Sequence, residues 1–192
     1  MQETDVFYPT SLTAWRKWFE ENHLSKQAVW LVFHSKSSGR PSISWSEAVD
    51  VALCFGWIDS KKIKMDAETS HQFFSRRKAQ STWSKINKEK VKSLIAQGLM
   101  TAAGLKAIAV AKENGSWTLL DEVEALVVPE DLTVALAAVE GAEDYFLSLS
   151  KSMRKMLLQW LVLAKRPETR QKRIAEIATY AGLQQRPPQF QL

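Results

Sequence analysis

Apolar residues recur at helical spacing through most of the chain and at strand spacing in a few short segments. Near the N-terminus, Ser11 precedes Leu12, Trp15 and Phe19. A serine before apolar residues three and four apart is typical of a capped helix. Residues 28–33, AVWLVF, are rich in β-branched and aromatic types and have polar neighbours. This run predicts a buried strand.

The clearest helix signal lies between residues 44 and 56. Ser44 and Glu47 have the spacing of a capping box, in which each side chain accepts a backbone N–H at the helix start. Apolar residues then fall on one face of the helix. Gly56 can adopt the left-handed conformation in which many helices end.

Two extended segments follow this helix, at residues 57–65 and 71–77, with a polar turn at 66–70 between them. We predict that they form a hairpin, and that this hairpin pairs with the strand at 28–33. The result would be a small, mainly antiparallel sheet.

Later segments carry apolar residues at helical spacing and are predicted to be helices. Ser84 and Thr101 are the predicted caps of the first two. The inward positions expected there are Val91, Leu94, Ile95, Leu105, Ile108 and Ala109. The buried stripe expected in a later helix is Met153, Met156, Leu157, Trp160 and Leu161. The fold class is therefore α+β, with a small, mainly antiparallel sheet in the N-terminal half and a largely helical C-terminal half.

A chain of 192 residues without a long linker predicts one α+β domain over residues 1–183. Pro129 and the acidic pair after it mark where a helical sub-domain would begin. Residues 184–192 include two consecutive prolines and are expected to be a flexible tail.

The N-terminal residues are acidic and lack the basic start and apolar run of a secretory signal. The longest apolar stretch is shorter than the ~20 residues that span a bilayer. These features predict a cytoplasmic protein without membrane insertion. Cys54 is the single cysteine, so no internal disulfide can form, and its apolar neighbours favour a core position.

The net charge of +5 is distributed in blocks. Residues 61–92 hold ten basic and three acidic residues, 113–144 hold nine acidic and no basic ones, and 151–186 hold nine basic and two acidic ones. The blocks either complement one another across the fold or form a positive surface for phosphate-bearing partners. Nucleic acid is a weakly supported partner, because no nucleic-acid-binding signature occurs.

Several kinds of site have no sequence signal. His23, His34 and His71 lack metal-ligand spacing relative to one another and to Cys54, so we expect no metal. The chain has no phosphate-binding loop, dinucleotide fingerprint or nucleophile elbow. We therefore expect no cofactor.

The segment from Trp57 to Asn87 is chemically unusual, because aromatic rings alternate with cations, hydroxyls and an amide. An arginine can hold a carboxylate or phosphate through two parallel hydrogen bonds, and a helix start adds free N–H groups. This composition predicts a pocket for a small anion or for a nucleotide. An acidic protein partner could present the same anionic group. The candidate ligand-binding residues are Trp57, Asp59, Arg77, Ser81, Trp83, Ser84 and Asn87.

Other readings of the same segment remain open. Trp57 and Trp83 also suit a core, and Ser84 suits a helix cap. An enzyme acting on a phosphorylated or carboxylated metabolite would use Asp59 as acid–base group and Arg77 as anion clamp.

Four motifs resemble the YdeI/OmpD-associated family, also called bacteriocin-protection proteins. They are residues 52–59 (ALCFGWID), Ser81-x-Trp83-Ser84-x-x-Asn87, residues 98–104 (GLMTAAG), and RPETR at 166–170 followed by Arg173-Ile174. The resemblance runs from about Trp15 to about Gly182. It implies a bacterial protein of stress or peptide-antibiotic tolerance. The family's arginine aligns with Arg77, and Arg76 stands where the family has proline, so Arg76 is the weaker candidate.

Overall fold

The computed structural model describes residues 4–191, which fall into two compact units. Unit 1 ends at Trp117 and unit 2 begins at Thr118. Each unit has its own cluster of buried apolar residues. The expectation of one domain over residues 1–183, with a helical sub-domain from about 129, stays a prediction.

Unit 1 is built on a four-stranded sheet in the order β1-β2-β4-β3. Its strands are β1 (Val6–Phe7), β2 (Ala28–His34), β3 (Trp57–Lys64) and β4 (Thr69–Arg76). β1 pairs with β2 in parallel, and the other two pairings are antiparallel. The predicted hairpin and its pairing with residues 28–33 are confirmed, and so is the α+β class.

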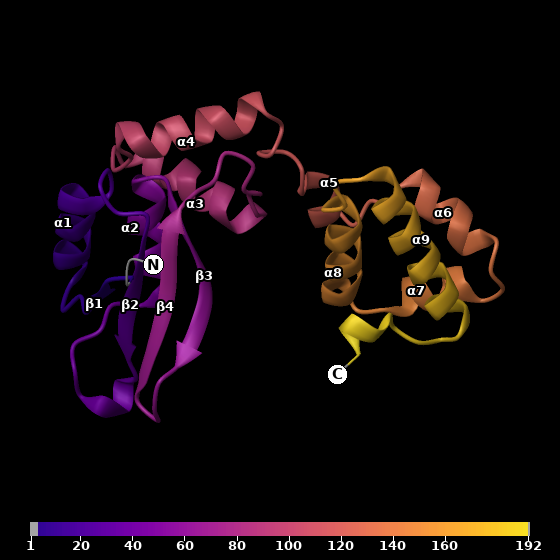
Figure 1. The fold of residues 1–192 in the computed structure, drawn as a ribbon, viewed down its shortest axis with the longest axis horizontal. Helices are drawn as coiled ribbons and strands as arrows, with labels where there is room; N and C mark the ends of the chain where they lie inside the picture. Colours follow the sequence, from indigo (N-terminus) through magenta and orange to yellow (C-terminus); the bar gives the residue numbers. More distant parts are fainter. Residues whose placement is uncertain (1–3, 192) are drawn as a thin grey trace. The chain divides into compact units, whose positions relative to one another are not determined.

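Helices cover one face and one end of this sheet. They are α1 (Leu12–Asn22), α2 (Trp45–Cys54), α3 (Lys85–Ala96) and α4 (Ala102–Glu113), with a short 3-10 turn, η1 (Lys36–Ser38), after β2. Figure 1 shows α1 and α2 beside the sheet, and α4 at the end where β3 begins and β4 ends. Trp15 and Phe19 of α1 are fully buried, and the Trp15 ring meets Phe74 of β4 edge-on.

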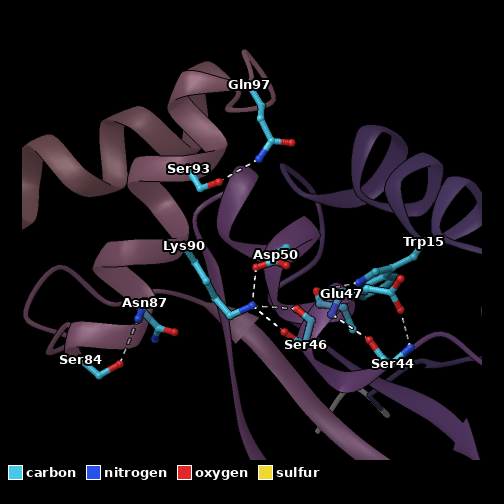
Figure 2. A network of polar contacts seen from close by, with 11 residues as sticks. Trp15, Ser44, Ser46, Glu47, Asp50, Ser84, Asn87, Lys90, Ser93 and Gln97 are labelled. Carbon is cyan, nitrogen blue, oxygen red and sulfur yellow. Dashed lines mark hydrogen bonds and ion pairs between the residues drawn. The ribbon is translucent and has the colours of Figure 1, made fainter.

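The capping box that the sequence predicts at α2 is present, because Ser44 and Glu47 each accept the other's backbone N–H. Lys90 of α3 ties the two helices together: its ammonium lies 2.6 Å from the Asp50 carboxylate and donates to the Ser46 hydroxyl (Figure 2). This ion pair is partly shielded from water, so it holds α3 against α2 more firmly than an exposed pair would.

The buried face of α4 differs from the prediction. Ile108 is buried as expected, but Leu105 and Ala109 are exposed, and Gly104 and Ala111 are buried. An ideal Cβ at Gly104 would lie 2.3 Å from the Cys54 carbonyl oxygen. The helix approaches that backbone so closely that only its small-residue face fits there. Ile95 of α3, expected inward, is also exposed.

Unit 2 is helical throughout its described length. Its helices are α5 (Asp121–Glu124), α6 (Glu130–Ala137), α7 (Ala142–Ser148), α8 (Lys151–Val162) and α9 (Pro167–Gly182), followed by the 3-10 turn η2 (Pro188–Phe190). Leu157 and Leu161 of the predicted stripe in α8 are buried. Met156 is 47% exposed, so that part of the prediction is wrong, and Leu158 takes the buried place.

The charge blocks of unit 2 pair with each other in part. Arg170 of α9 holds Asp131 of α6 through two hydrogen bonds of 2.6 and 2.9 Å. This contact lowers the pKa of the Asp131 carboxyl. In the segment predicted to be a tail, the Phe190 ring meets Trp160 edge-on. No helix within residues 4–191 is long and apolar enough to cross a membrane.

Candidate functional site

The start of β3 and the end of β4 bring two parts of the candidate segment together. Trp57 lies opposite Arg76 in the sheet, and the Arg77 N–H donates to the Gly56 carbonyl at 3.0 Å. Gly56 has φ +74°, a left-handed conformation that costs glycine little. Only Phe55 and Gly56 separate the end of α2 from the start of β3, and this turn places both arginines beside the beginning of the strand.

Helix α4 forms the opposite wall. The Thr101 hydroxyl at its start donates to the Cys54 carbonyl at 2.7 Å. An ideal Cβ on Gly56 would lie 3.1 Å from both the Ala103 oxygen and the Ala107 methyl. The two glycines, Gly56 and Gly104, therefore allow α4 to pack closely against the end of α2.

The guanidinium carbon of Arg77 lies over the Trp83 indole, 3.6 Å from the ring centroid. One terminal nitrogen donates to the Thr82 carbonyl at 3.0 Å. Burial lowers the pKa of Arg77 to about 10, and the charge of Asp59 acts against that shift. Arg77 is therefore still a cation at neutral pH, in surroundings that stabilise a cation poorly.

The remaining guanidinium nitrogens are the notable feature of this region. Nε and Nη2 of Arg76, and the same two atoms of Arg77, are buried without a hydrogen-bond partner among the described residues. A buried donor without an acceptor costs about 1–3 kcal/mol, and more when it is charged. Native structures rarely leave buried donors unpaired, so these nitrogens need an explanation. A bound anion is one such explanation.

Both arginines line a cavity of about 330 Å³, which we call the arginine pocket. Trp57 and Trp83, each 1% exposed, contribute to its wall. The other lining residues are His23, Leu24, Phe55, Gly56, Lys78, Ala79, Ala103, Lys106, Ala107 and Val110. No carboxylate occurs among these described lining residues, so the pocket combines apolar walls with positive charge that no lining residue balances.

The structure brings three of the predicted site residues together: Trp57, Arg77 and Trp83 all line the arginine pocket. Asp59 lies elsewhere, where its carboxylate accepts hydrogen bonds from the Trp45 indole at 2.9 Å and the Gln72 amide at 3.2 Å. The arginine pocket therefore gives no support to Asp59 as an acid–base group.

The three remaining candidates have local contacts. The Ser81 hydroxyl accepts the Lys78 N–H, and the Ser84 hydroxyl accepts the Asn87 N–H as the cap of α3. None of these three is among the described residues that line the pocket. These hydrogen bonds account for Ser81 as a turn residue and for Ser84 as a cap, and Asn87 contributes its backbone N–H to that cap.

Arg76, the weaker candidate by its sequence, lines the pocket, and so do residues of α4, none of which was a predicted site residue. Arg76 shares the pocket with Arg77 because β4 ends between them. Ala103 and Ala107 carry no chemical signal of their own. The small residues at Gly56 and Gly104 were the available sign that another element comes close.

The described residues give no sign of a metal site or of a reactive thiol. The described residues contain no cluster of three or more His, Cys, Asp or Glu that could hold a metal ion. Cys54 is fully buried, and burial raises the pKa of its thiol. A thiol in that state is a weak nucleophile.

Two family models match the chain. Residues 7–107, more than half of its length, match the model described as "Domain of unknown function (DUF8412)". Residues 125–182 match the model described as "Bacteriocin-protection, YdeI or OmpD-Associated". Of the motifs on which the resemblance rested, only the one at 166–174 lies inside the second match. Neither a curated protein nor a solved structure matches the chain significantly.

Proposed function

Since this chain belongs to the family described as "Domain of unknown function (DUF8412)", we propose its function from the site itself: unit 1 binds a small organic anion in the arginine pocket. The observation that carries the proposal is the set of buried nitrogens on Arg76 and Arg77 without partners. An anionic group in the pocket would offset both charges, and it would accept hydrogen bonds from these nitrogens when the guanidinium groups turn toward the cavity.

The remainder of the pocket defines the rest of the ligand. Ala103, Ala107 and Val110 offer an apolar wall, and exposed Lys78 and Lys106 also line the cavity. A carboxylate or phosphate ester with a compact apolar body fits this combination. An acidic protein partner would present the same group through an Asp or Glu side chain or its terminal carboxylate.

The biological setting is a second part of the proposal. The family match at residues 125–182 carries the words "Bacteriocin-protection" in its description, and it supports a role in stress or bacteriocin tolerance in bacteria. We propose that anion binding by unit 1 serves such a role in the cytoplasm. Cell fractionation with an antibody against the native chain tests the location, and recovery in the envelope fraction would contradict it.

A thermal-shift screen tests the anion site. Ligands that bind only the folded protein raise its melting temperature, and the rise grows with concentration over Kd. We expect aromatic and aliphatic carboxylates, or phosphate esters of similar size, to raise the melting temperature of the wild type. The matching neutral amides and alcohols should give no rise, because they leave the guanidinium charges unmet.

Arg77→Met is the decisive variant, with Arg173→Met as its matched control. Arg173 also stacks on a tryptophan, Trp160, at 4.8 Å, but it belongs to unit 2 and is not among the residues that line the arginine pocket. Arg77→Met should abolish the anion-dependent rise, whereas Arg173→Met should keep it. Equal rises in both variants, or none in the wild type with any anion, would refute the proposal.

A further inference from the structure

A second cleft lies at the other end of the sheet, around the hairpin turn. It has a volume of about 620 Å³ and is lined by residues of β2, the loop after it, the start of α2, and the hairpin. We call it the hairpin cleft. It shares no lining residue with the arginine pocket. From its chemistry we infer that the hairpin cleft binds a nucleotide, with the base on Trp45 and the phosphate on lysines of β3.

Trp45 provides the flat surface. Its side chain is 53% exposed, which is unusual for so large an apolar residue. Its indole N–H nevertheless donates to Asp59 at 2.9 Å. Gln72, only 4% exposed, donates to the same carboxylate oxygen at 3.2 Å and to the Ser60 carbonyl. The ring is thus held at one edge by a fixed polar network while much of its surface faces water.

A bulge in β3 directs the cations into the same cleft. Asp59 pairs with Phe74, and Lys62 pairs with Gln72, so β3 spans three positions where β4 spans two. The extra residue reverses which side chains share a face. Without it, the face of Asp59 would continue with Lys61 and Ile63. With it, the face continues with Lys62 and Lys64, and both of these lysines line the cleft.

The loop wall is held in place by hydrogen bonds. The Tyr8 hydroxyl donates to the Pro41 carbonyl, and the Ser42 hydroxyl accepts the His34 N–H at 3.1 Å. Lys36 and Arg40 on this loop also line the cleft. A cavity of this size between two fixed walls accommodates a mononucleotide.

The charge balance of the cleft favours an anion. Lys36, Arg40, Lys62 and Lys64 have no ion-pair partner within residues 4–191. Three carboxylates also line the cleft, but two of them are engaged with backbone. Glu47 accepts the Ser44 N–H, and Asp66 accepts the N–H groups of residues 68 and 69. These hydrogen bonds lower the pKa of Glu47 and Asp66 and leave both ionised, so four cations and three carboxylates line the cleft, with a net charge of +1.

A planar ring to stack on and a phosphate to neutralise are the two features that distinguish nucleotides from other ligands here. Apolar acids would use the ring but need fewer cations, and inorganic phosphate would use the cations but not the ring. A free mononucleotide and a nucleotide of a single strand present the same base and phosphate to this cleft.

The experiment uses the full-length chain, with adenosine monophosphate by calorimetry and a fluorescein-labelled oligothymidylate by anisotropy, both at low salt. Trp45→Ala should weaken binding on the order of tenfold, since stacking on one aromatic ring contributes that much. Trp45→Phe keeps a ring and should recover most of the affinity. The double variant Lys62→Gln/Lys64→Gln should also weaken binding and reduce its salt dependence, because it removes phosphate contacts.

Lys172→Gln, on an exposed position of α9, is the matched charge control and should bind like the wild type.

Displacement of the oligonucleotide by adenosine monophosphate would support a site for single nucleotides. Oligonucleotide binding without displacement, but with the Trp45→Ala loss, would support the same site on a strand. The inference fails if the wild type binds neither probe, if Trp45→Ala binds both as well as the wild type, or if inorganic phosphate competes as well as the nucleotide. Arg77→Met should leave this binding intact, which separates it from the arginine pocket.

Discussion

Two arginines in this protein stack on tryptophan and have different surroundings. Arg77 lies on Trp83 at 3.6 Å with two buried nitrogens that lack partners. Arg173 lies on Trp160 at 4.8 Å, donates to the Trp160 carbonyl, and has no buried nitrogen without a partner in the described structure. The stacking contact is common to both, so it does not by itself indicate a site. The unmet hydrogen bonds distinguish Arg77.

This difference predicts opposite effects of the same substitution on stability. Arg77→Met also loses a hydrogen bond, to the Thr82 carbonyl, and a stacked cation, but it removes a buried charge with two unmet donors and keeps an apolar stem on Trp83. We expect the free energy of unfolding of the ligand-free protein to stay the same or rise by about 1 kcal/mol. Arg173→Met loses a hydrogen bond and a stacked cation and should lower it by about 1–2 kcal/mol.

Urea unfolding, monitored by tryptophan fluorescence, measures the free energy of unfolding of both variants. If Arg77→Met lowered the free energy of unfolding as much as Arg173→Met does, Arg77 would be a structural residue whose hydrogen bonds are already satisfied. Loss of ligand binding together with unchanged or higher stability is the usual sign of a residue kept for function.

At the scale of elements, α4 positions the wall of the arginine pocket by close contact rather than by large apolar side chains. Its Gly104 faces the carbonyl of Cys54, and its Ala103 and Ala107 face Gly56. The bulge in β3 acts in a similar way at the other end of the sheet, because one extra residue decides which lysines face the hairpin cleft.

The α4 contact predicts a strong effect of one added methyl group. Gly104→Ala would place its Cβ 2.3 Å from a backbone oxygen, so the helix must shift. We expect a loss of about 1–3 kcal/mol in the free energy of unfolding, as for overpacked cores, together with weaker anion binding. Thermal unfolding measures the loss of stability, and the anion-dependent rise in melting temperature measures the weaker binding.

Ala109→Ser is the matched control, because Ala109 is exposed on the same helix. It should change stability by no more than about 0.5 kcal/mol. If Gly104→Ala matched this control in both measurements, the close approach of α4 to Cys54 would be wrong.

At the scale of the whole molecule, residues 4–191 form two separate apolar cores. One is formed by α1, α2, the sheet and its neighbours, and the other by the helices after Thr118. The arginine pocket and the hairpin cleft are both lined by residues of unit 1 alone. The two family matches also fall in different units, at residues 7–107 and 125–182.

The separate cores predict that residues 1–117 and 118–192 each fold when produced alone. Each fragment should unfold cooperatively, because its buried apolar residues form a complete cluster. Circular dichroism during heating measures this. The fragment 1–80 is the control and should not fold cooperatively, since it lacks α3 and α4. If neither full unit folded alone, the single domain predicted from the sequence over residues 1–183 would be the better description.

The sequence by itself determined the local structure, because caps and periodicity depend on residues a few positions apart. Ser44 with Glu47, Ser84 and Thr101 mark helix starts correctly. The run of β-branched and aromatic residues at 28–33 and the hairpin after Trp57 likewise predict the sheet pairing. Trp57, Arg77 and Trp83 could be selected as candidates because aromatic and cationic residues are rare so close together.

Only the tertiary structure decided which of these side chains meet. Arg76 joins Arg77 because a strand ends between them, while Asp59 turns to Trp45 and Gln72. Leu105 and Met156 are exposed because neighbouring elements pack against other faces of their helices. The periodicity of a single helix does not show which face its neighbours will cover. A pocket is formed by surfaces distant in sequence, so its contents are set by packing and by unmet hydrogen bonds rather than by any local pattern.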